Sequence, residues 1–407
     1  MSPHYFAKNS GMNCLSQMLN ALEVQAGRDL TVGILKNSYY ENVALIESEY
    51  VMAGDEPDGV DKYIADLKSK GKKLNVFVAE VHHNISATAH TYNKELIIGQ
   101  VRRLMSEDCI ETPFTLILDT TLDMTDSEDL KTILSTFSDE IESGTLAIVL
   151  LRSAQKYDFM GLDNYNGGVM SVYCEDDTFS RALECLSKPE SQLHRQSLQG
   201  LLHFNKCSST TLGDYRKLSV SNTMDTHRAL DAGVLYKPDT ENLIQISTTS
   251  DYELPFIDIK FSAELNKQQA FNVCNFITRA ISTQKLFMQR PSFGFMYATG
   301  STIPREDGLL YRINMGLDEH KRTFSIAETI NLVGKLVNDV RDYVKVTCAE
   351  IGSEYSTFLT GDVLHEFLNS TDSQIFLEKS LMSTDYPDKI DKLLSDIIYP
   401  IIIALPD

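Results

Sequence analysis

The 407-residue chain lacks the features that mark several classes of protein. No stretch approaches about eighteen consecutive apolar residues, so no transmembrane helix is expected. The N-terminal sequence MSPHYFAKNSG has no apolar core and does not resemble a signal peptide. The seven cysteines are scattered, odd in number and without CxxC spacing. They indicate reduced thiols in a cytoplasmic protein, and they favour neither a disulfide framework nor a metal site.

Positive charge is also scarce. The chain has 37 lysines and arginines against 57 aspartates and glutamates, which gives a net charge of -20. Such an acidic surface repels phosphate backbones, so nucleic acid is not an expected partner. The C-terminal run IIYPIIIALP is interrupted by Pro400 and is too short to cross a membrane. An apolar content of 43% and this length are typical of a globular protein with two domains.

The first half of the chain alternates between strand and helix patterns. The predicted strands are 30–35, 74–81, 114–121 and 145–153, and the predicted helices are 11–24, 94–105 and 127–141. Strands that alternate with helices indicate right-handed crossovers and therefore a mostly parallel sheet in an α/β fold. Ligands of such sheets bind beyond the carboxyl ends of the strands. Glu80, Asp119 and Ser153 lie at these predicted ends.

The second half predicts a smaller domain. Strand patterns occur at 254–262 and 309–316, and helical patterns at 266–285 and 325–346. Between the halves, residues 175–255 mix helix-like runs at 178–187 and 192–204 with polar stretches. We therefore expect a large domain over 1–250 and a smaller α+β domain over 251–407, with an additional helical extension from about residue 347.

Three positions suggest chemistry. Lys156 follows a predicted strand and precedes a glycine-rich stretch; a lysine desolvated over a cleft has a lowered pKa and can form a Schiff base. Asp119 ends a strand of the same sheet, where a carboxylate can keep a pyridine nitrogen protonated. Ser10 and Gly11 open a helix whose N-terminus favours a phosphate. From these residues alone, a surface lysine, a capping aspartate and an ordinary Ser-Gly cap remain the commoner explanations.

Several segments nevertheless resemble, in the same order, the Cys/Met-metabolism family of pyridoxal-5′-phosphate (PLP) enzymes, which includes cystathionine γ-synthase, cystathionine β-lyase and methionine γ-lyase. The segments are SGM (10–12), YEN (40–42), FVAEVHHN (77–84), LILDTT (116–121), SAQKYDFMGLDNYNGG (153–168), SFGF (292–295) and GLLYRINMGLDE (308–319). The resemblance implies an aspartate-aminotransferase-like fold, PLP fold type I, with the mostly parallel sheet in the large domain.

The resemblance also implies a role for each matching residue. The cofactor PLP would be bound by Ser10, Gly11, Met12 and Ser153 at its phosphate, Tyr40 and Asn84 at its ring and phenolic oxygen, Asp119 at its pyridine nitrogen, and Lys156 through the Schiff base. Lys156 and Tyr40 would be the catalytic groups. Arg312 would hold the α-carboxylate of the substrate, for which a bidentate guanidinium is suited, and Ser292 would also contact the substrate. No metal ligand is implied.

The implied reaction is elimination or replacement at the β or γ carbon of a small amino-acid substrate, with a sulfur amino acid or an activated homoserine as the first expectation. The chain departs from the family in three places. Gln155 and His82 stand where the family has a threonine and a proline, and the chain begins close to the phosphate loop, so the family's N-terminal arm is not expected. Without that arm, Arg152, Arg216 and Lys217 are the candidates to neutralise the phosphate.

Two alternatives remain open. The first is a PLP-dependent aminotransferase or decarboxylase, which would use the same Lys156 and Asp119. The second is a catalytically inactive interaction protein that retains the fold. The resemblance also implies a homodimer or homotetramer. No membrane partner is expected, because the sequence has no stretch long and apolar enough to span a bilayer. The adjacent His82 and His83 do not suggest a metal pair, because neighbouring residues of a strand point to opposite faces.

Overall fold

A computed structural model gives the fold. It describes residues 2–35, 38–46, 50–52, 59–82, 94–123, 127–159, 166–188, 193–204 and 209–230, and shorter stretches between 235 and 334. The chain divides into two compact units: Met1–Leu218 with Asp251–Leu254 and Phe293–Met296, and Ser219–Ser250 with Pro255–Ser292 and Tyr297–Asp407. The sequence placed the division near residue 250, whereas the contacts place it within helix α9 (Ser209–Arg228).

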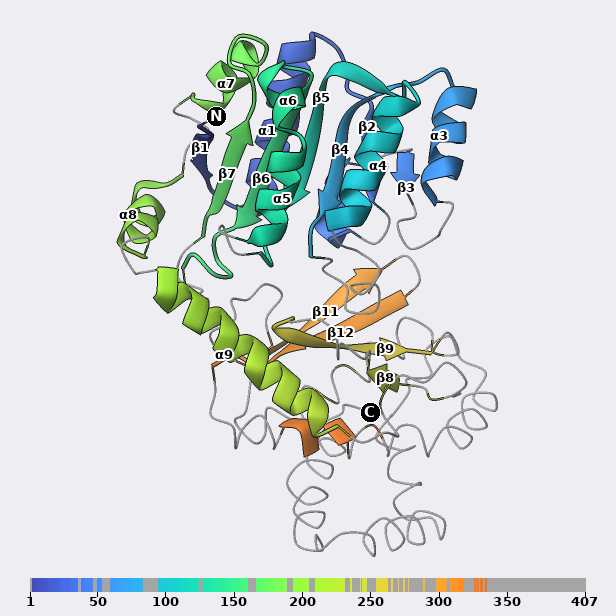
Figure 1. Ribbon diagram of the computed structural model, residues 1–407. Coiled ribbons are helices and arrows are strands. Elements are labelled where there is room, and N and C mark those ends of the chain that lie inside the picture. The colour runs from blue at the N-terminus through green and yellow to red at the C-terminus, as the bar shows by residue number, and fades with distance from the viewer. Residues whose placement is uncertain are drawn as a thin grey trace, which may run out of the picture. The chain divides into compact units, whose positions relative to one another are not determined.

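A seven-stranded sheet forms the centre of the first unit (Figure 1). In spatial order its strands are β1 (His4–Lys8), β7 (Gly168–Tyr173), β6 (Leu146–Ser153), β5 (Ile110–Asp119), β4 (Leu74–Glu80), β2 (Val32–Leu35) and β3 (Tyr50–Met52). The strands from β6 to β3 pair in parallel, while β7 pairs antiparallel with both β6 and β1. Of these seven strands β7 alone runs against the others, so the sheet is mostly parallel, as predicted.

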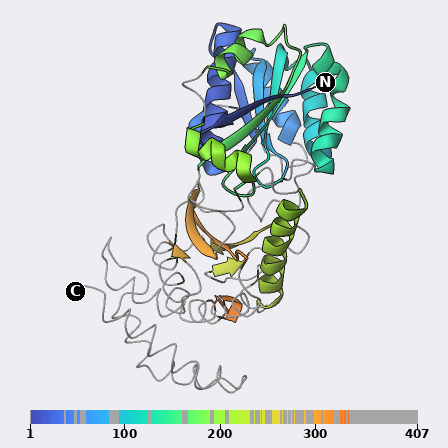
Figure 2. The same ribbon diagram turned by 90° about the vertical axis from the view of Figure 1, so that its left-hand side faces the viewer.

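Helices cover both faces of this sheet (Figure 2). On one face, α1 (Gly11–Ala26) and α7 (Ser180–Leu186) bury Leu15, Met18 and Leu186 against the strands. On the other face, α3 (Gly59–Ser69), α4 (Lys94–Ser106), α5 (Glu128–Thr136) and α6 (Ser138–Glu142) pack against the sheet. The central strands therefore have apolar side chains on both faces, which explains their continuous apolar sequences.

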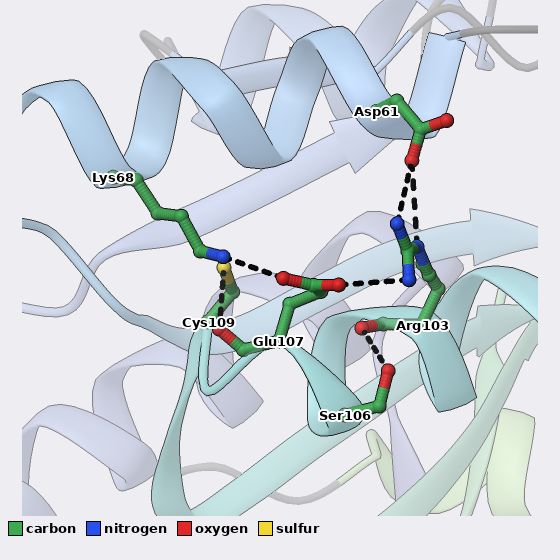
Figure 3. A network of polar contacts seen from close by, with 6 residues as sticks. All are labelled: Asp61, Lys68, Arg103, Ser106, Glu107 and Cys109. Carbon is green, nitrogen blue, oxygen red and sulfur yellow. Dashed lines mark hydrogen bonds and ion pairs between the residues drawn. The ribbon is translucent and has the colours of Figure 1, made fainter.

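A network of polar contacts joins α3 to the end of α4 (Figure 3). The carboxylate of Glu107 accepts a hydrogen bond from Lys68 Nζ at 2.5 Å and lies 2.7 Å from Nη1 of Arg103. Nη2 of Arg103 donates to Asp61 Oδ1 at 3.3 Å. These side chains are partly exposed, so the network orients the two helices more than it stabilises the fold.

The four strands predicted in the first half of the chain are all present as β2, β4, β5 and β6. The prediction of a single helix over 127–141 is wrong, because the segment forms two helices. Phe137, with backbone angles of φ -110° and ψ 20°, separates α5 from α6. Strands β1, β3 and β7 were not predicted. The helix-like runs of the middle region correspond to α7 and α8 (Arg195–Phe204).

A second sheet organises the second unit. Its order is β10 (Met288–Gln289), β11 (Thr299–Arg305), β12 (Gly308–Asn314), β9 (Phe256–Phe261) and β8 (Ile244–Ile246). Strands β9 and β12 correspond to the two predicted strands. The predicted helices at 266–285 and 325–346 fall mostly outside the described residues, and the extension from about residue 347 falls wholly outside them.

Two features of the described residues bear on the class of the protein. Among the described residues, no helix combines the length and the apolar character needed to span a bilayer. Cys14, Cys109, Cys174, Cys185 and Cys274 are free thiols, as predicted.

Candidate functional site

The carboxyl ends of β4, β5 and β6 bring together the polar residues that the sequence placed there. Glu80 and Asp119 are register partners in the parallel ladder, and Asp119 also pairs with Leu151, two residues before Ser153. The carboxylate of buried Glu80 accepts a hydrogen bond from the backbone N–H of Tyr39 at 2.5 Å. Glu80 therefore fixes the chain as it enters α2 (Tyr40–Ile46).

Two donors hold the carboxylate of Asp119. Asn42 Nδ2 donates to Oδ2 at 3.1 Å, and the backbone N–H of Thr121 donates to Oδ1 at 2.9 Å. Burial raises the pKa of Asp119, while the hydrogen bonds from Thr121 and Asn42 oppose that shift. A cationic partner would stabilise the ionised form of a carboxylate that is partly withdrawn from water in this way. Sequence reasoning missed Asn42, although it lies in the YEN segment.

The N-terminus of α1 lies against the ends of β6 and β7. Ser10 caps the helix, because its Oγ accepts a hydrogen bond from the backbone N–H of Asn13 at 3.0 Å. A Cβ atom on Gly11 would lie 3.0 Å from the backbone nitrogen of Ser153, and one on Gly168 would lie 2.2 Å from the carbonyl oxygen of Ser10. Glycine at both positions thus brings the helix N-terminus, where an anion is favoured, beside Ser153.

Lys156 lies in the turn that follows β6. The turn is closed by a hydrogen bond from the backbone N–H of Phe159 to the carbonyl oxygen of Ala154 at 2.9 Å. The hydroxyl of Tyr215, on α9, donates to the carbonyl oxygen of Lys156 at 3.2 Å. The rings of Tyr157 and Tyr215 meet edge to face with centroids 6.0 Å apart. These contacts hold the backbone of the half-buried Lys156 at the carboxyl edge of the sheet.

His82 and Asp123 form a pair at the same edge. His82 Nδ1 lies 2.5 Å from Oδ1 of Asp123, whose side chain is 1% exposed against 28% for His82. Burial lowers the pKa of His82, but the hydrogen bond and the negative charge of Asp123 outweigh burial and raise it. The charge of Arg216 acts on His82 in the opposite direction, so this arginine also lies near the edge. Sequence reasoning placed His82 here and missed Asp123, which follows Asp119 by four residues.

One candidate for the phosphate charge is already engaged. Arg152 donates from Nε and Nη2 to the two carboxylate oxygens of Asp158, at 2.8 and 2.6 Å. Both side chains are largely buried, at 15% and 7% exposure. Arg152 therefore stabilises the Lys156 turn through Asp158, and the expectation that it neutralises a phosphate is not supported.

Arg312 is a buried residue of β12 in the second unit. Its Nε and Nη2 donate to the carboxylate of Asp258 on β9, at 2.8 and 3.0 Å. Its guanidinium stacks on the ring of Phe256 at 3.6 Å. The bidentate geometry predicted for a substrate carboxylate is thus used for a carboxylate of the protein.

Three of the predicted site residues cannot be placed by the structure. Asn84 and Ser292 lie outside the described residues, and of Tyr40 only the backbone, at the start of α2, is described. Met12 follows Gly11 in the first turn of α1. The structure brings Ser10, Gly11, Met12, Asp119, Ser153 and Lys156 to one edge of one sheet.

No family model matches the chain. No curated protein matches it either. Solved structures do match. A cystathionine γ-synthase from Xanthomonas oryzae pv. oryzae, in complex with aminoacrylate and cysteine, is 13% identical over 82% of each chain, with a TM-score of 0.57. A cystathionine γ-lyase from Lactobacillus plantarum, complexed with L-serine, is 14% identical over 82% of each chain, with a TM-score of 0.55.

A third match was solved with a pyridoxyl-lysine monophosphate. It is a protein assigned as an O-acetylhomoserine (thiol)-lyase from Campylobacter jejuni, 13% identical over 80% of this chain and 81% of that chain, with a TM-score of 0.54. At these identities the likeness concerns the fold. The chain has the fold of the Cys/Met-metabolism PLP enzymes, and the prediction of PLP fold type I is confirmed.

Proposed function

We propose that this chain is a PLP-dependent enzyme that acts on an amino acid by elimination or replacement at the β or γ carbon. The observation that carries the proposal is the common location of Lys156, Asp119 and the N-terminus of α1 at the carboxyl edge of the seven-stranded sheet. This edge is where ligands of such sheets bind. The three features match the Schiff-base amine, the pyridine partner and the phosphate site that the cofactor requires.

The described residues fit PLP in charge as well as in position. A protonated pyridine nitrogen is a cation, and it would pair with the Asp119 carboxylate, whose pKa burial has raised. A phosphate suits the N–H groups at the start of α1, beside Ser153. When bound, PLP supplies an electron sink for charge that develops at the α carbon of the substrate.

The protein side chains then have separate tasks. Asp119, held by Asn42 and Thr121, would keep the ring nitrogen of bound PLP protonated. The ε-amine of Lys156 removes the α-proton as general base. The contacts of Tyr215 and Asp158 with the Lys156 turn and its flanking strand hold the backbone that carries that amine. The substrate roles of Arg312 and Ser292 stay predictions.

A sulfur amino acid or an activated homoserine is the proposed substrate class. This proposal is supported by two structural neighbours, which are named as a cystathionine γ-synthase and an O-acetylhomoserine (thiol)-lyase. A homodimer or homotetramer is the proposed assembly, on the resemblance alone.

The test is an absorbance spectrum of the purified protein with added PLP. Wild type should develop a visible band from covalently bound PLP, which borohydride fixes to the peptide containing Lys156. Lys156→Ala should lack the band, and the control Lys72→Ala, at an exposed lysine, should retain it. A wild-type protein without the band would overturn the proposal and leave the inactive interaction protein as the better reading.

Amino acids are then screened for the product released. Thiol or ammonia together with a keto acid indicates elimination, whereas carbon dioxide indicates decarboxylation. A pyridoxamine spectrum indicates transamination. Either of the last two results would replace the proposed reaction while leaving the cofactor assignment intact.

A further inference from the structure

A second group of chemically reactive side chains lies at the opposite edge of the seven-stranded sheet from the candidate site. It consists of His4, Cys174 and Asp176. His4 begins β1, and Cys174 directly follows β7. Because β7 runs against the other strands, its end meets the start of β1 at the edge where the parallel strands begin. Residues 172 positions apart are thereby brought into contact.

The strand register explains why two of these side chains converge. His4 is the register partner of Val172, and Cys174 lies two residues beyond Val172. Residues two apart on a strand share a face, so Cys174 is the diagonal neighbour of His4. Cys174 belongs to the same buried cluster as Val172, on the face covered by α1 and α7. The thiol therefore points to the same side of the sheet as the imidazole.

The turn after β7 supplies the third group. The carboxylate of Glu175 accepts hydrogen bonds from the backbone N–H groups of Asp177 and Thr178, at 3.2 and 2.7 Å. This turn directs Asp176 back toward β1, where its Oδ1 lies 2.8 Å from His4 Nε2. One ligand atom from each of the three residues lies within 4.8 Å of the other two.

We propose that His4, Cys174 and Asp176 form a zinc site that ties β1 to the end of β7. One thiolate, one imidazole and one carboxylate are ligands that zinc accepts together, and they disfavour magnesium and calcium, which take oxygen ligands. Ligand atoms of a tetrahedral zinc ion lie about 3.3–3.7 Å apart, so the three groups need to move little to bind one.

The exposure of the three side chains agrees with this assignment. Cys174 is 3% exposed, whereas the side chains of His4 and Asp176 are 36% and 73% exposed. The open side of the site leaves a fourth position for water.

The proposed site is independent of the PLP chemistry. Its effect is on the fold: β1 is an edge strand of five residues that pairs only with β7 in the described sheet, and it leads directly to Ser10. A metal at its start would hold the strand that delivers the N-terminus of α1. Spacing along the sequence does not reveal the site, because the ligands come from two distant segments.

The test uses the full chain without a polyhistidine tag. Zinc binding is measured by calorimetry, and Co²⁺ is added as a spectroscopic substitute, in difference spectra against the metal-free protein. Wild type should bind one zinc per chain and show a thiolate-to-cobalt charge-transfer band. Cys174→Ser should lose the band, and the control Cys109→Ser, at another buried free cysteine, should retain it.

Two further variants separate metal binding from folding. His4→Gln and Asp176→Asn change partly exposed side chains, so neither should prevent folding. Each should weaken zinc binding by at least about tenfold, since even the loss of a group that only supports a ligand costs this much. Zinc should raise the melting temperature of wild type and not of His4→Gln. A wild type without a thiolate band, or a band and affinity unchanged in His4→Gln and Asp176→Asn, overturns the site.

Discussion

The Nδ1–H group of His82 donates to a carboxylate oxygen of Asp123 only 2.5 Å away, at the carboxyl edge of the sheet that also holds Lys156. The histidine stands where the resembling family has a proline. Its Nδ1 is engaged by Asp123, so its orientation is set from one side and the other ring nitrogen is directed away from that carboxylate. The resemblance to the family therefore does not account for the pair of His82 and Asp123.

Replacing Asp123 by asparagine should lower the pKa of His82. The carboxylate raises that pKa above its ordinary value of 6.5, against the effect of burial. A raised folded-state pKa means that the stability from this pair is complete below about pH 6.5 and is lost as the pH rises through the folded-state value. NMR titration of His82, with unfolding measured between pH 5 and about pH 9, tests both statements.

The control for this change is Asp176→Asn, which removes an exposed carboxylate at the opposite edge of the sheet. It should leave the titration of His82 unchanged. An unchanged titration in Asp123→Asn as well would show that the pair does not govern this histidine.

Asn42→Ala should destabilise the protein by about 1–3 kcal/mol near neutral pH, because it removes a donor from the half-buried carboxylate of Asp119. The hydrogen bond from Asn42 favours the ionised form of Asp119 and opposes the rise in pKa that burial causes, so its contribution is lost as the carboxylate becomes protonated at low pH. The deficit should therefore shrink in acid. Urea unfolding at two pH values measures it, with exposed Asn20→Ala as control; equal deficits at both pH values would contradict the assignment.

Gly168→Ala should disturb the phosphate end of the site. The added methyl group would lie 2.2 Å from the carbonyl oxygen of Ser10, so the first turn of α1 must shift. We expect a loss of about 1–3 kcal/mol in stability and weaker PLP binding, measured by denaturation and by PLP titration. The matched control is Gly99→Ala in α4, where nothing lies within 4 Å of the new atom and where helix propensity predicts a gain of about 1 kcal/mol. PLP affinity equal to that of wild type in Gly168→Ala would contradict the close approach.

Asp258→Ala should cost about 3–5 kcal/mol, because it leaves the buried charge of Arg312 without its carboxylate. Replacing both residues by apolar ones, Asp258→Leu with Arg312→Met, should recover most of that loss, since an apolar pair avoids burying charge. Denaturant unfolding of the single and double variants gives the comparison. A double variant as unstable as Asp258→Ala would show that Arg312 has another structural task.

Glu107→Gln should have a small effect that depends on salt. The carboxylate lies between Lys68 and Arg103 (Figure 3), and hydrogen bonding from Lys68 lowers the pKa of Glu107. The stabilisation is present above its ordinary value of 4.5 and is lost as the pH falls through the lowered folded-state value. The melting temperature of wild type should fall slightly relative to the variant in high salt or acid, and a salt-independent difference would contradict the ionic origin.

The sequence predicted those strands and helices that can be recognised from the pattern of their own residues. Runs such as LILD and LAIVLL identify β5 and β6, because a strand with helices on both faces is apolar throughout. Strand β1 has no such signal: Tyr5 is 71% exposed, and the segment becomes a strand by pairing with β7. The interruption at Phe137 was missed because the apolar periodicity continues through it, although this buried ring ends one helix and begins the next.

The same distinction applies to the candidate site. Asp119, Ser153 and Lys156 follow strands, and strand ends can be read from the pattern. Their partners cannot, because Asn42 reaches Asp119 across 77 residues and Asp123 reaches His82 across 41. The engagement of Arg312 by Asp258 was likewise invisible, since both are ordinary strand residues until the antiparallel register pairs them.

The pairing of Glu80 with Asp119 in the ladder of β4 and β5 has a consequence for how the gene can change. Side chains alternate between the faces of a strand, so a one-codon insertion or deletion inside β5 would turn Asp119 away from Asn42 and put Leu118 or Thr120 in its place. The same change would also move the apolar residues of the core. Selection should therefore remove insertions and deletions in β5 for two reasons, the displaced Asp119 and the displaced core residues. This part of the site can then change only by point substitution.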